Sequence, residues 1–305
     1  MLSAVRALRR GLEWPTLGLA GLVYAGWIGA TLWHDKLNPF ALAALGGWLI
    51  AWHGSLQHEA IHGHPTPWRA MNTLIAAPPL SLWLPYEIYR RSHLQHHASE
   101  DLTHPAYDPE ARYLRAGSGW RRRAAAKLQA TLAGRIVIGP LIEVVHFAVA
   151  ETRRVWRGEA DARRVWLGHF AAVAVVWAWL HFVCGMSLGK YLACFVYPGL
   201  ALSLVRSFAE HRADPTPGHR VAVVERAPIF GLLFLNNNLH AAHHTWPGLS
   251  WWRLPERYRE HRATLLQANG GLVYNGYSDV FARFLMRPHD VLEHPLDQVE
   301  RGGDG

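Results

Sequence analysis

The sequence contains three histidine motifs: His58-Glu59-Ala60-Ile61-His62, His93-Leu94-Gln95-His96-His97 and His240-Ala241-Ala242-His243-His244. On a helix, residues three and four positions apart lie on one face, so each motif can direct its rings toward one point. A neutral imidazole is a good ligand for iron, copper, zinc or nickel. Eight rings exceed the four ligands of a tetrahedral zinc ion and the six of an octahedral ion, so the motifs predict a site for two metal ions.

Apolar segments long enough to cross a bilayer core of about 30 Å lie before the first motif and between the second and third. We predict four membrane spans in two helical hairpins, at about residues 16–34, 40–57, 165–186 and 188–206. Two shorter apolar segments, residues 71–86 and 136–150, are not predicted to span, because Pro78-Pro79 and Pro140 interrupt them. An additional span at either place would also put the motifs on opposite sides of the membrane. We expect both segments to lie at the membrane surface.

The expected fold is an all-α membrane protein with one domain over residues 1–305. A helical cap would comprise residues 58–164 and 207–290, and a frayed tail would follow at 291–305. Of 31 Lys and Arg residues, only Lys36 and Lys190 would lie on the side away from the cap. Cationic residues beside spans tend to remain cytoplasmic, and Arg6, Arg9 and Arg10 carry most of that argument here. We therefore expect both termini and the metal site on the cytoplasmic side.

The third motif continues as Thr245-Trp246-Pro247 and is followed by Trp251-Trp252-Arg253-Leu254-Pro255. In their order and spacing, the three motifs and this continuation resemble the integral-membrane fatty acid desaturase superfamily. Relatives in that superfamily include carotenoid ketolases and hydroxylases and alkane hydroxylases. The resemblance covers roughly residues 45–260. It implies a non-haem di-iron centre that reduces O2 and removes hydrogen from an unactivated C–H bond.

The resemblance also implies a set of metal ligands. His211 directly follows the last predicted span, where the family has an additional histidine, so we expect it to join the eight motif histidines. The predicted ligands are His58, His62, His93, His96, His97, His211, His240, His243 and His244. His64 is a further candidate only if the helix ends at Gly63.

Ligating histidines usually donate their second N–H to a carboxylate or a carbonyl group. We expect such outer contacts from Glu59, Glu210 and Asn237, which adjoin predicted ligands. The carboxylates Asp101, Asp108 and Glu110, which follow the second motif, remain open between this role and a solvated surface.

The predicted function is O2-dependent desaturation of a fatty acyl chain or lipid. Hydroxylation or ketolation of a carotenoid, an alkane or another apolar small molecule would use the same metal cluster, and the sequence does not separate the two. A zinc-binding membrane hydrolase or structural protein is a third reading, because His58-Glu59-Ala60-Ile61-His62 matches HExxH, in which the Glu acts as general base. A catalytic zinc needs only one more protein ligand, which would leave most of the other histidines without a role.

Such oxygen chemistry requires two external electrons per O2. The sequence shows no GxGxxG dinucleotide motif, no CxxC pattern and no haem-binding segment, so we expect an external electron carrier of the ferredoxin, rubredoxin or cytochrome type. The other expected partners are the bilayer and an acyl or lipid substrate. The formal net charge of +8 is explained by membrane topology, and no motif indicates nucleic-acid binding. The substrate, the electron donor and the oligomeric state are left open.

Overall fold

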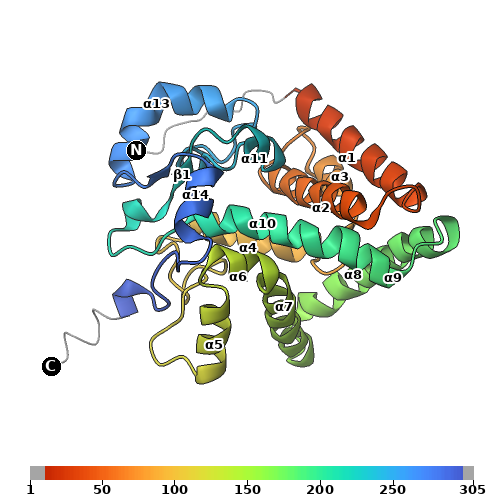
Figure 1. Ribbon diagram of the computed structural model, residues 1–305, viewed down its shortest axis with the longest axis horizontal. Helices are drawn as coiled ribbons and strands as arrows, with labels where there is room; N and C mark the ends of the chain where they lie inside the picture. Colours follow the sequence, from red (N-terminus) through yellow and green to blue (C-terminus); the bar gives the residue numbers. More distant parts are fainter. Residues whose placement is uncertain (1–10, 298–305) are drawn as a thin grey trace.

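The computed structural model describes residues 11–297 of the chain and is mainly helical, as predicted (Figure 1). Among these residues the sheet is confined to two parallel two-residue strands, β1 (Val223–Val224) and β2 (Val273–Tyr274). The first half of the chain forms α1 (Trp14–Leu32), α2 (Pro39–Ile61), α3 (Arg69–Ala76), α4 (Tyr86–Ala98), α5 (Trp120–Leu128), α6 (Leu132–Val137) and α7 (Gly139–Trp156). The second half forms α8 (Ala160–Ala178), α9 (Leu188–Tyr191), α10 (Tyr197–Glu210), α11 (Pro228–Leu233), α12 (His240–Thr245), α13 (Leu254–Ala268) and α14 (Tyr277–Phe284).

Within residues 11–297, three helical segments are long and apolar enough to cross a membrane: Trp14–Leu32, Asp161–Val183 and Leu188–Glu210. The second and third each contain one π-helical turn, Trp179–Val183 and Leu192–Val196, which continues the adjoining α-helix. Helix α2 has 23 residues but does not reach the same apolarity, because His53, Gln57 and Glu59 lie in its second half. The predicted count of four spans is therefore not confirmed.

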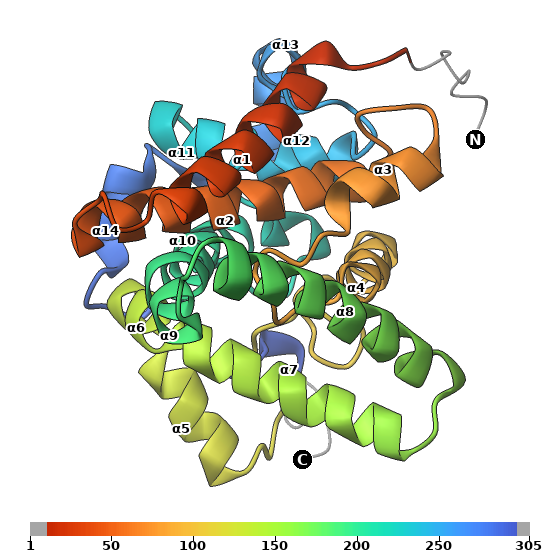
Figure 2. The ribbon, with the colours of Figure 1, turned by 90° about the vertical axis from the view of Figure 1, so that its right-hand side faces the viewer.

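Helix α2 lies at the centre of the fold and packs against both α1 and α10 (Figures 1 and 2). Glycines make this close contact possible. A Cβ atom on Gly199 would lie 2.5 Å from Cβ of Ile50, and one on Gly47 would lie 2.8 Å from Cβ of Pro198. The backbones of α2 and α10 are thus in close contact. Because His58 lies near the end of α2 and His211 follows α10, this packing also sets where the two histidines lie.

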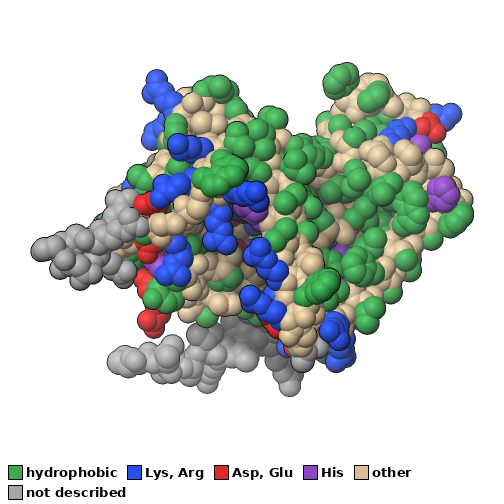
Figure 3. All heavy atoms as spheres, turned by 90° about the horizontal axis from the view of Figure 1, so that it is seen from below, with side chains coloured by type: hydrophobic (Ala, Val, Ile, Leu, Met, Phe, Trp, Pro, Cys, Tyr) green, Lys and Arg blue, Asp and Glu red, His purple; other side chains and the backbone are tan. Residues whose placement is uncertain are grey.

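Helix α8 exposes large apolar side chains along its length. Leu167 and Val175 are each 71% exposed, and Phe182 in the following turn is 80% exposed. Seen from below, the right-hand part of the molecule is mainly hydrophobic, whereas Lys and Arg side chains gather over the left and the centre (Figure 3). Single exposed apolar side chains are ordinary, but a continuous apolar surface of this kind indicates contact with lipid.

The two segments that we excluded as spans are also not among the candidate spans. Residues 71–86 contain the end of the eight-residue α3, followed by turns at Pro78-Pro79. The next segment is divided close to Pro140, since α6 ends at Val137 and α7 begins at Gly139. Pro140 lies in the first turn of α7, where its missing N–H leaves no hydrogen bond unmade.

The described part of the expected frayed tail, residues 291–297, is held in place. Within residues 291–297, His294 is fully buried, Asp297 is 7% exposed, and both make hydrogen bonds to the loop after α4. Buried polar partners keep this segment in place, which its hydrophilic composition did not reveal. Residues 298–305, like the cationic Arg6, Arg9 and Arg10, lie outside the described residues.

Candidate metal centre

The nine predicted ligands meet in two groups. The five-histidine cluster contains His58, His62, His93, His97 and His243, and the four-histidine cluster contains His96, His211, His240 and His244. Within each cluster the ligand nitrogen atoms all lie within 4.8 Å of one another. The clusters are neighbours, because the rings of His97 and His244 stack with their centroids 4.3 Å apart.

Each HxxHH motif divides its rings between the two clusters. In α4, His93 and His97 join the five-histidine cluster, and His96 joins the four-histidine cluster. In α12 the assignment is reversed, because His240 and His244 lie together and His243 crosses over. The expectation that each motif directs its rings toward one point is thus wrong for these two motifs. Adjacent helical positions differ by about 100° around the axis, so the adjacent histidines diverge.

The remaining ligands come from the ends of long helices. His58 lies in the last turn of α2, and His62 caps that helix. His211 follows α10 directly, where the backbone becomes extended and pairs with Val221. The end of α2 therefore positions two histidines of the five-histidine cluster, and the end of α10 positions one histidine of the four-histidine cluster.

The Nε2 atoms point toward one another. Their separations are 3.0 Å for His62 and His93 and 3.0 Å for His97 and His243. They are 2.9 Å for His211 and His240 in the other cluster. Two nitrogen atoms bound about 2.1 Å from one ion lie about 3.0 to 3.4 Å apart, depending on the coordination angle. The donor sets therefore fit a metal ion in each cluster.

His58 adds an independent indication. Its Nε2 is buried without a hydrogen-bond partner, although the ring centroid lies 4.6 Å from those of His93 and His243. A buried polar atom without a partner is costly, and a metal ion at the centre of the five-histidine cluster would satisfy it.

The environment keeps these rings neutral, the form that binds metals. Burial and then the neighbouring imidazoles lower the pKa of His62 to about 2 and of His97 to about 3. The same two causes lower the pKa of His211 to about 3. His96 differs: burial lowers its pKa, but its hydrogen bond to Asp108 and nearby carboxylates outweigh that effect and raise it.

Outer contacts orient the four-histidine cluster. Three of its rings have an oxygen atom within hydrogen-bonding distance of Nδ1. Nδ1 of His96 lies 2.9 Å from Asp108 Oδ1, and Nδ1 of His240 lies 3.1 Å from Asn237 Oδ1. Nδ1 of His211 lies 3.2 Å from the Arg220 carbonyl oxygen. When Nδ1–H donates to such an acceptor, the lone pair of the ring lies on Nε2, which faces the cluster. Asn237 also donates to Glu210 Oε1 at 3.0 Å, and that carboxylate pairs with Arg206.

In the five-histidine cluster, Glu110 Oε1 lies 3.2 Å from Nδ1 of His93. Burial raises the pKa of Glu110, but its interactions with His93, His96 and Arg206 outweigh that effect and hold the pKa of this carboxyl group well below its usual range. Asp108 and Glu110, which the sequence left undecided, thus face ligand rings. Asp101 instead contacts the buried guanidinium of Arg220, at 3.5 Å.

One proposed outer residue, Glu59, and the further candidate ligand, His64, have other partners. Glu59 accepts the backbone N–H of Trp251 at 3.1 Å, and its carboxylate is 3.9 Å from Nδ1 of His58. His64 lies in neither cluster, and its Nδ1 is 2.7 Å from Glu13 Oε1. The structure therefore separates Glu59 and His64 from the positions at which the ligand atoms converge.

Several residues around the clusters were not predicted from the sequence. The Arg220 carbonyl group that faces His211 has no sequence signal, because any residue carries one. His294 and Asp297 contact Thr103 and His104 in the loop that holds Asp108, and contacts between segments so far apart cannot be read from spacing. A buried Arg206 four residues before Glu210 was detectable as an i,i+4 pair at the end of an apolar helix.

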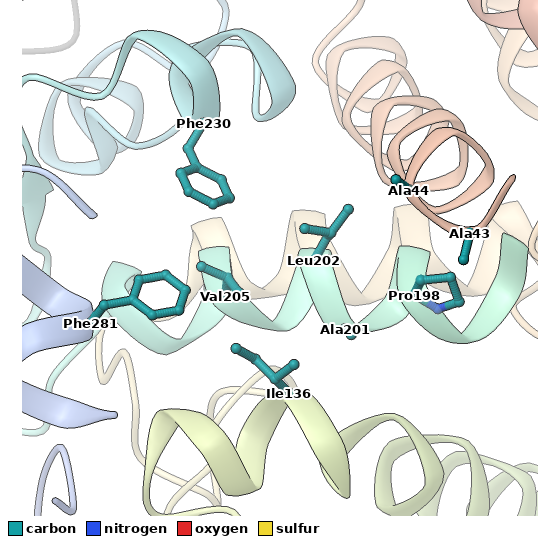
Figure 4. Close-up of a pocket in the computed structure, with 9 residues that line it drawn as sticks. All are labelled: Ala43, Ala44, Ile136, Pro198, Ala201, Leu202, Val205, Phe230 and Phe281. Atoms are coloured by element: carbon teal, nitrogen blue, oxygen red, sulfur yellow. The ribbon is translucent and has the colours of Figure 1, made fainter. Parts of the chain in front are cut away.

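An apolar cavity of about 330 Å³ lies away from the histidines, between α2 and α10. Ile136, Phe230 and Phe281 from three further helices point into it (Figure 4). None of its lining residues belongs to either cluster. This cavity accommodates apolar groups but contributes nothing to metal binding.

Comparison with known proteins agrees with this geometry. A family model described as fatty acid desaturase matches residues 36–277, most of the chain, and the protein belongs to that family. The family consists of membrane-bound oxidoreductases of the desaturase and hydroxylase type, is known for di-iron sites and acts on lipid substrates. No curated protein sequence matches the chain.

Proposed function

We propose that this protein is a membrane-bound non-haem di-iron oxidoreductase that desaturates a fatty acyl chain or lipid in an O2-dependent reaction. One observation supports it above all: nine histidines, drawn from the three motifs and the end of α10, form two adjacent clusters whose Nε2 atoms converge. Iron bound there would supply the oxygen chemistry that amino-acid side chains lack. Electrons would come from an external carrier of the ferredoxin, rubredoxin or cytochrome type.

The chain's own residues would hold and orient the two ions. The five-histidine cluster and the four-histidine cluster would each bind one ion through Nε2. Asp108, Asn237 and the Arg220 carbonyl group would fix the tautomer of the rings beside them by accepting Nδ1–H. Burial of the rings would exclude bulk water from the ions.

We propose a topology of four spans, in which α2 spans the membrane in addition to the three candidate spans. Helix α2 packs between two candidate spans, α1 and α10, so it would be shielded from lipid and would tolerate polar residues. An even number of spans would keep all three motifs on one side of the membrane. The Lys and Arg side chains that gather over part of the surface support a cytoplasmic position for that side (Figure 3).

The hydrolase reading is disfavoured by Glu59. In an HExxH protease the Glu would act as general base next to the metal, but here its carboxylate accepts a hydrogen bond from Trp251. In addition, a single zinc ion would leave the four-histidine cluster without a function.

The test compares lipids and small molecules by untargeted mass spectrometry in cells that express the wild type or His243→Ala with an electron carrier. We expect a product lighter by two hydrogen atoms only with the wild type. A product heavier by one oxygen atom would instead identify a hydroxylase. Purified wild type that contains zinc and no iron, with neither product formed, would reject the oxidoreductase proposal.

A further inference from the structure

A buried chain of hydrogen bonds connects the C-terminal part of the described chain to the four-histidine cluster. His294 Nε2 lies 3.0 Å from Thr103 Oγ1, and the Thr103 N–H donates to Asp108 Oδ2 at 2.8 Å. The other carboxylate oxygen of Asp108 lies 2.9 Å from Nδ1 of His96. Each of these four residues is at most 4% exposed, so water does not compete for their hydrogen bonds.

Thr103 is held in an unfavourable conformation. Its φ angle is 70°, in the left-handed region that a β-branched residue rarely adopts. Such a backbone conformation is unfavourable and persists only where its surroundings impose it. His294 binds the side chain of Thr103 and Asp108 binds its N–H, so the two contacts together impose this conformation.

More contacts join the same two segments, the carboxylate loop (residues 99–116) and the C-terminal strap (residues 290–297). The Leu114 N–H donates to the Leu292 carbonyl oxygen at 2.8 Å, and the His294 N–H donates to the Leu114 carbonyl oxygen at 3.1 Å. Asp297 lies 3.2 Å from His104 Nε2 and accepts the Ala116 N–H at 2.9 Å. The carboxylate loop contains no regular helix, so these contacts supply much of its rigidity.

We propose that the C-terminal strap positions the metal centre, and that His294 is a positioning residue that acts through Thr103 on Asp108 and His96. This inference rests on the proposed metal site in the four-histidine cluster. The same loop carries Glu110, but its contact with His93 is longer, 3.2 Å, and its side chain is 31% exposed. The strap therefore acts mainly on the four-histidine cluster.

The first experiment titrates metal-free, full-length His294→Ala with Fe²⁺ under anaerobic conditions. Loss of an outer contact typically lowers metal affinity 10- to 100-fold. Because His294 acts one residue further out, we expect about tenfold weaker binding of one ion and unchanged binding of the other. His294→Gln, which retains a polar group near Thr103, should recover most of the loss.

Two further variants assign the effect. In a His240→Ala background, which lacks one ligand of the four-histidine cluster, His294→Ala should have no additional effect on the remaining ion. His289→Ala is the matched control, since this histidine precedes the strap and lies 2.9 Å from Tyr274 Oη rather than against the carboxylate loop. It should lower thermal stability and leave both iron affinities unchanged.

Hydrogen exchange of the metal-free protein provides a second readout. The Thr103 and Glu110 amides both donate to Asp108, and they should exchange faster in His294→Ala. If His294→Ala does not fold, Asp297→Asn decides the question, because it keeps the side-chain size and weakens the contact with His104. If the variant binds two ions with wild-type affinity and its Thr103 and Glu110 amides exchange at the wild-type rate, the proposed role of the C-terminal strap is wrong, and the proposed metal centre is unaffected. Failure of the wild type to bind any iron would instead reject the proposed metal centre.

Discussion

The five-histidine cluster and the four-histidine cluster are built from the same motifs but secure their geometry differently. The first has one more imidazole, and Glu110 is its partly exposed outer partner. The second has one ring fewer, and three of its four rings face a named oxygen acceptor, with Asp108 and Asn237 both buried. In the proposed metal site, firmer orientation of the rings would compensate for the smaller number of ligands.

Removal of one ring from each cluster should have the largest effect on this comparison. His211→Ala leaves three rings in the four-histidine cluster, whereas His62→Ala leaves four in the other. We expect His211→Ala to lose one of two iron ions during dialysis and His62→Ala to retain both with weaker affinity, because four ligands still close a coordination sphere. Iron per chain, measured by elemental analysis, tests this. Equal losses in the two variants would contradict the asymmetry.

Removal of the outer carboxylates should have the next largest effect. Asp108→Asn is expected to weaken one iron site by about tenfold or more, because Asp108 is buried and orients His96. Glu110→Gln should weaken the other site less, because water can replace part of an exposed contact. Fe²⁺ titration of the two variants compares them directly. A larger effect at Glu110 would show that the five-histidine cluster is the more dependent on its surroundings.

Acidification should empty the clusters in a defined order. Protons compete with metal for imidazole, and the raised pKa of His96 makes it protonate at a higher pH than His62, whose pKa is lowered to about 2. As pH falls through the raised pKa of His96, the four-histidine cluster should therefore release its ion first. Iron content of dialysed samples should fall in two steps. Asp108→Asn, which removes the largest of the contacts that raise the pKa of His96, should bring the steps closer together.

Glu59 should have the smallest effect of the residues tested. Burial raises its pKa to about 7, so the neutral form that Gln resembles is already accessible. Glu59→Gln can still accept the Trp251 N–H, and we expect unchanged iron content and a loss of about 1 kcal/mol or less in unfolding free energy. Chemical denaturation and elemental analysis measure both quantities. Loss of a hydrolytic activity in this variant would revive the HExxH reading.

The sequence alone determined the family, the mainly helical fold and which histidines come together. Motif spacing and the lengths of apolar segments are local properties, and they were enough to place His211 at the end of a long apolar helix, where it follows α10. The prediction of a span at residues 40–57 gave too little weight to the polar residues in the second half of α2. The structure buries these residues against neighbouring helices.

Only the tertiary structure decided which rings of different motifs meet. Helix geometry makes the adjacent His96 and His97 diverge, because about 100° separates neighbouring positions, but it does not determine which histidines of the other motifs each of them joins. The outer contacts of Asp108 likewise depend on Thr103 and His294, which are 191 residues apart. The residue types in the sequence set which side chains can bind a metal. Which of their nitrogen atoms converge depends on the packing of distant segments, because only folding brings those segments together.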